Sequence, residues 1–278
     1  IAEPPLFNTV LLEFDTAIPP NEVYTINLDG QISDCLGRAV ENGRTAEFAI
    51  PDQAEALDII VNEILFNPAT GGSDFVELYN RSQKILNLSD LVIATRSAGS
   101  LSDVQVIETG YLIFPNQYVV LTESVEDIRF RYQVQQPTAL IEANLPSLPD
   151  KAGTVVIYRT GALSEVVLDE FEYSNDFHNA LLDDENGVSL ERINPDAPTQ
   201  DENNWHSAAA SAGFATPTAQ NSQFLQTINS SDAFSLTAPT ISPDDDGFQD
   251  FLQINYDLDQ AGFTANASIF DANGRLVK

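Results

Sequence analysis

The chain has 278 residues, and its 12 Lys and Arg stand against 42 Asp and Glu, giving a formal net charge of -30. This excess opposes binding to nucleic-acid phosphates or anionic lipid, which requires clustered basic residues. The single cysteine, Cys35, excludes an internal disulfide, and no apolar run reaches the roughly 18 residues of a membrane helix. Since 43% of the residues are hydrophobic, we expect a folded protein with neither nucleic-acid binding nor membrane insertion.

Short runs rich in Val, Ile, Phe and Tyr, bounded by turn-forming residues, predict strands along most of the chain. In chain order these are Val10–Phe14, Val23–Leu28, Ile59–Phe66, Phe75–Tyr79, Leu91–Ala94, Tyr118–Leu121, Thr154–Tyr158, Val166–Tyr173 and Ile269–Phe270. In Glu123–Tyr132 the apolar spacing instead favours a short helix starting near Thr122 or Ser124. The pattern is typical of an all-β protein with one or two helical turns.

Two polar stretches, Pro51–Glu55 and Gln220–Asp232, predict segment boundaries. They divide the chain into residues 1–52, 53–223 and 224–278. Each end segment has only about half of the roughly 100 residues of an immunoglobulin sandwich. The end segments are therefore either parts of larger repeats or pack on a neighbour.

The first segment contains Leu12-Glu13-Phe14, the strand-like Tyr24–Leu28, Ile32-Ser33-Asp34 and Gly37. This pattern resembles the closing half of S-layer-type bacterial immunoglobulin-like repeats. The resemblance implies a partial immunoglobulin-like segment at the start of the chain.

The middle segment carries five motifs in order. They are Ile60–Pro68, Asp74–Asn80, Leu88–Leu91, Gly187–Ile193 and Asn203–Trp205. Together they resemble the lamin-tail domain of secreted bacterial proteins over roughly residues 57–222. The resemblance implies an immunoglobulin-like β-sandwich and a set of structural motif residues: Asn62, Glu63, Asp74, Glu77, Asn80, Arg192 and Trp205.

Glu63 and Glu77 are the candidate chemical pair, because two carboxylates on adjacent strands can act as acid and base or hold a cation. Strict alternation places Glu63 on one face with Ile59 and Val61, and Glu77 on one face with Phe75. A carboxylate in an apolar row needs partners, such as backbone N–H groups or neighbouring Asn side chains. The pattern favours a structural role, while a metal-dependent hydrolase requires an open cleft containing both acids.

Trp205 is expected to plug one end of the sandwich, with its indole N–H bonded to a carbonyl; a sugar-stacking platform is the alternative. The histidines, His178 and His206, lack a metal-binding spacing and are expected to be ordinary polar residues. The usual hydrolase, P-loop and zinc-site patterns are absent from the sequence. We therefore expect a protein that is not an enzyme.

The tail is similar to the start of the immunoglobulin-like repeats of gliding-motility and hook-capping proteins, from Ser242–Asp250 onward. Asp244, Asp246 and Asp250, with a turn at Gly247, form a candidate calcium loop of hard oxygen ligands. The alternative is a solvated acidic turn.

These observations favour a non-catalytic, exported or cell-surface module that binds, anchors or spaces within a larger multidomain protein. Its ligand loops are expected at Ala98–Thr109 and Gln133–Lys151, and its partner is a protein or glycan. The absence of any Met suggests a removed leader and a secreted, periplasmic or cell-surface location. The alternatives are a calcium-dependent adhesion or glycan-binding module, and a metal-dependent secreted hydrolase or its accessory domain.

Overall fold

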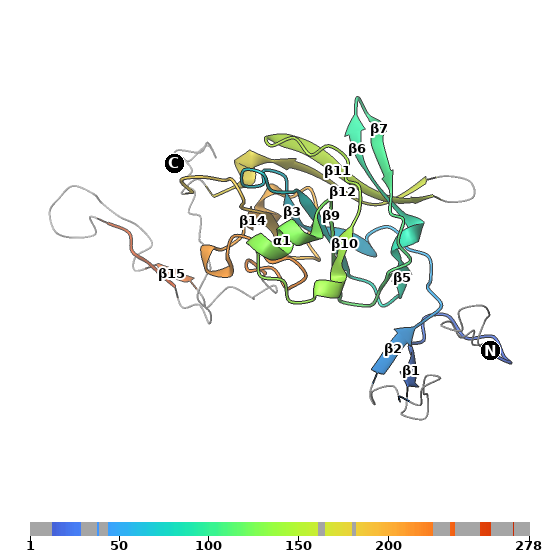
Figure 1. Ribbon diagram of the computed structural model, residues 1–278. Helices are drawn as coiled ribbons and strands as arrows, with labels where there is room; N and C mark the ends of the chain where they lie inside the picture. Colours follow the sequence, from blue (N-terminus) through green and yellow to red (C-terminus); the bar gives the residue numbers. More distant parts are fainter. Residues whose placement is uncertain are drawn as a thin grey trace.

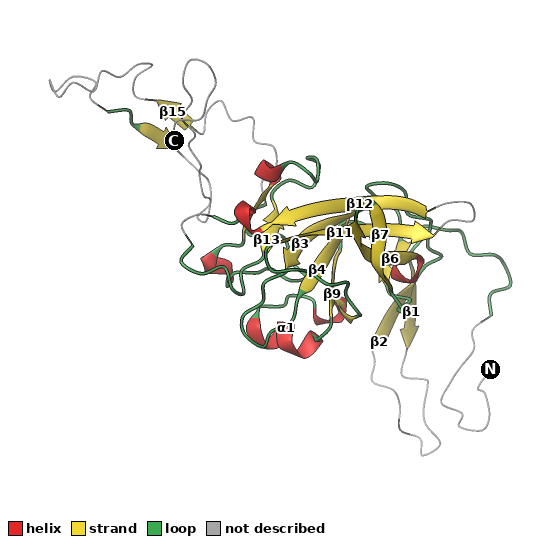
Figure 2. Ribbon diagram, turned by 90° about the horizontal axis from the view of Figure 1, so that it is seen from above, coloured by secondary structure: helices red, strands yellow, loops and turns green. Residues whose placement is uncertain are grey.

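The protein folds as a two-layer β-sandwich, with a strand pair described on either side of it along the chain (Figures 1 and 2). The computed structural model describes residues 13–28, 38, 44–160, 165–179, 182–224, 234–236, 251–256 and 269. The prediction of an all-β, immunoglobulin-like sandwich is confirmed.

One layer is a six-stranded sheet. Its strands, in spatial order, are β10 (Leu140–Glu142), β9 (Tyr118–Thr122), β4 (Phe75–Asn80), β3 (Ile59–Leu65), β13 (Leu190–Arg192) and β14 (Trp205–Ser207). Neighbouring strands are antiparallel except for β10, which runs parallel to β9. Strand β10 therefore forms one edge of this layer and β14 the other.

The other layer is a four-stranded antiparallel sheet. Its strands, in spatial order, are β12 (Glu165–Ser174), β11 (Ala152–Thr160), β6 (Leu91–Ser97) and β7 (Ser100–Val106). Alternate residues of both sheets point inward. Val119 and Leu121 of β9 join the same buried cluster as Ile93 of β6 and Ile157 of β11. The core therefore lies between the two layers.

A short helix, α1 (Val125–Arg131), packs on the outer face of the six-stranded sheet, where Ile128 is buried with Val120. Figure 2 shows it on the far side of this sheet from β11 and β12. The helix begins after Ser124, whose hydroxyl accepts a hydrogen bond from the Asp127 N–H at 3.3 Å, as the sequence predicts. No helix in the described part of the chain is long and apolar enough to cross a membrane.

Single 3-10 turns connect several strands. Those described are η1 (Leu88–Asp90), η2 (Pro137–Ala139), η3 (Asn175–Phe177), η4 (Glu202–Asn204) and η5 (Ala210–Ala212).

Three strand pairs complete the described elements. They are β1 (Tyr24–Leu28) with β2 (Arg44–Phe48), β5 (Leu86–Asn87) with β8 (Leu112–Ile113), and β15 (Phe234–Leu236) with β16 (Ile254–Tyr256). The β1–β2 strand pair stands away from the sandwich in Figure 1. Of the predicted strands Val10–Phe14 and Ile269–Phe270, the described residues Glu13, Phe14 and Ile269 lie outside strands.

The predicted loop Ala98–Thr109 is wrong over most of its length, because it contains strand β7. This strand has a mixed, mostly polar sequence, pairs only with β6 and lies at the sheet edge. It follows a two-residue turn in which Ala98 and Gly99 have φ of 49° and 81°. Positive φ at both residues is the hairpin geometry usually provided by Asn-Gly, so the Ala-Gly pair hid the hairpin.

Candidate functional site

Three glutamates form a continuous row across the outer face of the six-stranded sheet. Glu191 of β13 lies directly opposite Glu63 of β3, and Glu63 lies opposite Glu77 of β4. All three side chains are 0% exposed. We call these three residues the glutamate row.

A β-bulge at Asn62 turns Glu63 toward this outer face. The register of β3 against β4 shifts between Val61 and Glu63, so Asn62 has no partner opposite it. Val61 before the bulge and Ile64 after it both face the central core. The expectation that Glu63 shares the face of Ile59 and Val61 is therefore wrong, because one inserted residue reverses the alternation.

The row is covered by residues 214–223, which we call the strap. Three strap backbone N–H groups donate to the three carboxyl groups. Thr216 donates to Glu63 at 2.9 Å, Thr218 to Glu77 at 2.6 Å, and Gln223 to Glu191 at 2.8 Å.

Every carboxyl oxygen of the row has a hydrogen-bonding partner. Side chains complete the set: Ser189 on Glu63, Asn62 on Glu77, Ser222 on Glu191, and Thr216 between Glu63 and Glu191. The carboxyl groups therefore link the strap to the sheet.

Burial keeps the row partly protonated. It raises the pKa of Glu63 to about 8, aided by the charge of Glu191, against the hydrogen bonds that lower it. Burial also raises the pKa of Glu77, well above its usual value, and that of Glu191.

The hydrogen bonds of Thr216 also require a proton on the glutamate row. The Thr216 hydroxyl lies 2.7 Å from Glu191 Oε1 and 3.2 Å from Glu63 Oε2. A hydroxyl has one hydrogen. Both contacts are satisfied when one of the two acids is protonated and donates to the Thr216 hydroxyl, which then donates to the other acid.

A buried ion pair joins the two sheets. Arg192 of β13 donates to Asp169 of β12 at 3.1 Å and to the Thr199 hydroxyl at 2.5 Å. Asp169 also accepts from the Val61 N–H, just before the bulge, at 2.9 Å and from the Thr199 hydroxyl at 2.5 Å. Burial raises the pKa of Asp169 and lowers that of Arg192 to about 10, so the guanidinium remains charged at neutral pH.

Trp205 packs beside this ion pair. Its ring stacks on Phe171 of the opposite sheet, with centroids 3.7 Å apart, and the guanidinium of Arg192 lies 5.2 Å from its centre. The indole N–H donates to the Thr199 carbonyl at 2.8 Å. Trp205 is 3% exposed, so its ring faces are not open for stacking on a sugar.

Asn80 fixes the turn after β4. Its amide donates to the carbonyls of Lys84 and Ile113 at 2.8 and 3.0 Å, and its oxygen accepts from Ser82. These contacts tie the β4–β5 connection to β8.

Asp74, just before β4, has an incomplete set of hydrogen bonds on its carboxyl group. Its Oδ1 is buried and has no hydrogen-bonding partner. Burial raises its pKa to about 7, and the nearby charges of Asp150 and Glu123 add to the shift.

A cavity of about 280 Å³ opens where β7 and β10, edge strands of the two sheets, approach the same end of the sandwich. We call it the acidic mouth. Its lining residues are Val106, Ile107, Glu108, Thr109, Glu123, Ile141, Glu142, Ala143 and Asn144. All but Glu123 come from the two regions where the sequence analysis expects ligand loops.

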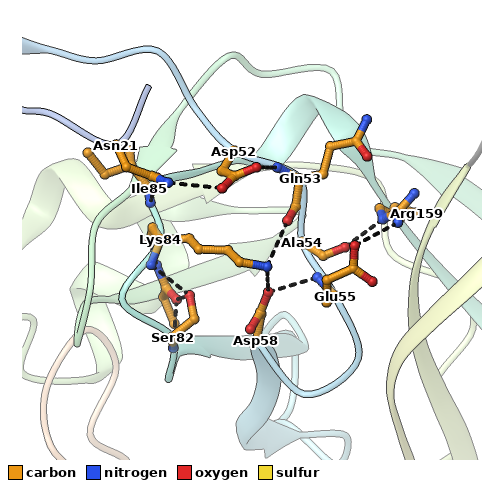
Figure 3. Close-up of polar contacts among 11 residues, drawn as sticks. Asn21, Asp52, Gln53, Ala54, Glu55, Asp58, Ser82, Lys84, Ile85 and Arg159 are labelled. Atoms are coloured by element: carbon orange, nitrogen blue, oxygen red, sulfur yellow. Dashed lines mark hydrogen bonds and ion pairs between the residues drawn. The ribbon is translucent and has the colours of Figure 1, made fainter. Parts of the chain in front are cut away.

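A polar junction holds the N-terminal segment to the sandwich (Figure 3). Asn21 donates to Asp52 at 2.9 Å and accepts from the Ile85 N–H at 3.0 Å. The Lys84 ammonium group donates a hydrogen bond to Asp58 at 2.8 Å. This junction could not be predicted from the sequence, because its members are ordinary residues far apart along the chain.

The described residues do not form a metal site from the remaining candidate ligands. Asp244, Asp246 and Asp250 lie outside the described residues. Among the residues that the structure does describe, no three His, Cys, Asp or Glu side chains are grouped so that they could hold a metal ion. His178 is buried, and its Nδ1 lies 2.9 Å from the Ser207 hydroxyl.

Sequence reasoning missed Glu191, Asp169 and the strap. Asp169 follows the apolar run Val166–Leu168, and that signal could have indicated a buried acid, whereas Glu191 stands between Leu190 and Arg192 without such a run. The predicted boundary Gln220–Asp232 includes the end of the strap. Its polar side chains instead provide the partners that the buried glutamates need.

The Lamin Tail Domain family matches residues 52–278 of the chain. The comparison with curated proteins gives no match. Among solved structures, the chain is similar to a DUF4876 family protein from Bacteroides thetaiotaomicron, with 13% identity and a TM-score of 0.35. That alignment covers 64% of this chain and 76% of the other, and a likeness this distant says nothing about activity.

Proposed function

Because the chain belongs to the lamin tail domain family, we propose that it is a non-catalytic β-sandwich module that binds a protein or glycan partner at the acidic mouth. The observation that carries this proposal is the separation of the acids into two groups. The glutamate row is sealed beneath the strap, whereas Glu108, Glu123 and Glu142 line an open cavity.

The sealed row argues against a hydrolase centred on Glu63 and Glu77. A pair of catalytic carboxylates needs a substrate within hydrogen-bonding reach. Both side chains are 0% exposed, and all four of their carboxyl oxygens are engaged by protein groups. The pair therefore lacks the open cleft that the hydrolase hypothesis requires.

The mouth has the features of a ligand site formed on a rigid scaffold. Loops positioned by a packed core commonly carry binding residues. Here the flanking segments leave β7 and β10, whose partner strands β6 and β9 contribute buried residues to the core. The walls combine apolar Val106 and Ile141 with polar Thr109 and Asn144, a mixture typical of ligand pockets.

In this proposal the module serves within a larger exported or cell-surface protein. The S-layer-type and gliding-motility resemblances of residues 1–52 and 224–278 support such a setting. Calcium-dependent adhesion through Asp244, Asp246 and Asp250 stays a sequence-based prediction. It is tested by whether calcium raises the melting temperature.

The Thr109→Trp variant tests the mouth as a binding site. Thr109 lines the cavity, so an indole there should obstruct it and weaken binding roughly tenfold or more. The full chain would be screened on peptide and glycan arrays, and every ligand found would be titrated against wild type and variant.

Thr70→Trp is the matched control, because Thr70 is exposed and absent from the cavity lining. We expect at least one ligand whose binding is lost in Thr109→Trp and kept in Thr70→Trp. An array with no ligand, or binding that is unchanged in Thr109→Trp, would contradict the proposal.

A further inference from the structure

We propose that the acidic mouth binds a lysine or arginine side chain of an extended partner polypeptide. This inference rests on the proposed function and names the chemistry of its ligand. It is carried by the cavity's charge, its apolar walls, the half-buried Asp74 next to it and the strand edges on either side.

Charge comes first. Glu108, Glu123 and Glu142 all line the cavity, and no lysine or arginine is among the lining residues. All three glutamates are exposed and therefore accessible to an incoming group. A cationic side chain is the complement that such a cavity selects.

The apolar walls favour a long side chain over a bare ion. Val106, Ile141 and Ala143 lie among the carboxylates in the lining. Lysine and arginine bury their methylene stems along apolar surface while their charged heads contact polar groups. A cavity of about 280 Å³ lies just below the usual 300 to 1,000 Å³ of small-molecule pockets, a size suited to one side chain.

Asp74 adds a buried acceptor close to this site. Its Oδ1 has no hydrogen-bonding partner. Asp74 lies next to Glu123 of the lining, because Phe75 pairs with Thr122 and the Thr122 hydroxyl donates to the Asp74 carbonyl at 2.8 Å. A guanidinium or ammonium group beside Glu123 therefore places a positive charge near a carboxyl group that lacks one hydrogen-bonding partner.

The spread of the acids argues against a divalent cation. Calcium and magnesium require several oxygen ligands around one point. In the described parts of the chain no three acidic or histidine side chains are grouped in that way. The carboxylates of the mouth instead come from three separate segments. This arrangement suits the ammonium or guanidinium group of a basic side chain, which has several N–H donors.

The strand edges favour a polypeptide over a free amine. Strands β7 and β10 are the outermost strands of their sheets, so among the described strands each has a neighbour on one side only. Unpaired backbone groups of an edge strand can accept an added extended segment. A peptide can therefore pair along an edge while one of its basic side chains enters the mouth.

The test uses the full chain and a fluorescein-labelled peptide of five Lys-Thr repeats, with five Gln-Thr repeats as the neutral probe. Binding is followed by fluorescence anisotropy at physiological salt. The mouth variant combines Glu108→Gln, Glu123→Gln and Glu142→Gln. Its control combines Glu165→Gln, Glu172→Gln and Glu202→Gln, three exposed glutamates outside the cavity that give the same change in net charge.

We expect the lysine peptide to bind wild type, the mouth variant to weaken binding about tenfold, and the control to stay within about twofold. Equal weakening in both variants would mean diffuse attraction to the net charge and would overturn the inference. So would tighter binding of the neutral probe, no binding of the lysine peptide, or mouth-dependent binding of calcium chloride in its place.

The two proposals fail in different ways. Array ligands whose affinity falls in Thr109→Trp but does not change in the triple Glu→Gln mouth variant would support the binding function. They would also show that the ligand is not cationic. If Thr109→Trp also has no effect on any ligand, both proposals are wrong.

Discussion

Replacing Arg192 by methionine is expected to lower the free energy of unfolding by about 3 to 5 kcal/mol, because it leaves a buried carboxylate without its cation. Arg192 and Asp169 have side chains 1% and 2% exposed and lie 3.1 Å apart. Methionine cannot donate to Asp169 or to Thr199, and it also removes the cation over the Trp205 ring. Urea denaturation of the two proteins measures the difference.

Arg81→Met provides the comparison, since it makes the same chemical change in an exposed pair. Arg81 and Asp196 lie 3.6 Å apart with side chains 33% and 79% exposed. Solvent screens such a pair, so its loss should cost less than about 1 kcal/mol. Similar effects of the two substitutions would show that the Arg192 ion pair does not join the sheets as described.

The free energy of unfolding is also expected to fall as pH rises from about 4.5 to about 8. Burial raises the pKa of Glu63 from 4.5 to about 8 in the folded protein. Between these values the folded state keeps a proton that the unfolded chain has released, so stability is lost as pH increases. At about 1.4 kcal/mol per pH unit, the loss from this carboxyl group is on the order of 5 kcal/mol.

Glu63→Gln should flatten this pH dependence, because the amide resembles the neutral acid in shape and does not ionise. Denaturation midpoints measured across the pH range give the slope for each protein. Glu165→Gln, which changes an exposed residue of β12, should retain the wild-type slope. A wild-type stability that rises steadily through this range, or a Glu63→Gln slope equal to wild type, would refute the buried-acid assignment.

Strand alternation predicts the parts of the fold in which a sheet face is clearly apolar. Val119 and Leu121 of β9 and Ile157 of β11 point into the core as their spacing indicates. The helix start at Ser124 also follows from local chemistry, since a serine hydroxyl can accept from an N–H three residues ahead. These features depend on neighbours along the chain and can therefore be read from the sequence.

Features that depend on distant partners could not be read in this way. The bulge at Asn62 is stabilised by Asp169, which accepts from Val61 across 108 residues, and it reverses the face on which Glu63 lies. The polarity of the strap suggests solvent until Glu63, Glu77 and Glu191 are placed beneath it. In both cases the sequence shows the polar groups but not their pairing.

The central claim is that the glutamate row is sealed and braces the sandwich while binding takes place elsewhere. The most direct test follows the side-chain carboxyl carbon signals of Glu63, Glu77 and Glu191 by NMR from about pH 4 to about pH 9. We predict a midpoint near 8 for Glu63 and raised midpoints for the other two. Three ordinary midpoints near 4.5 would mean that these acids are open to solvent, and would contradict the account.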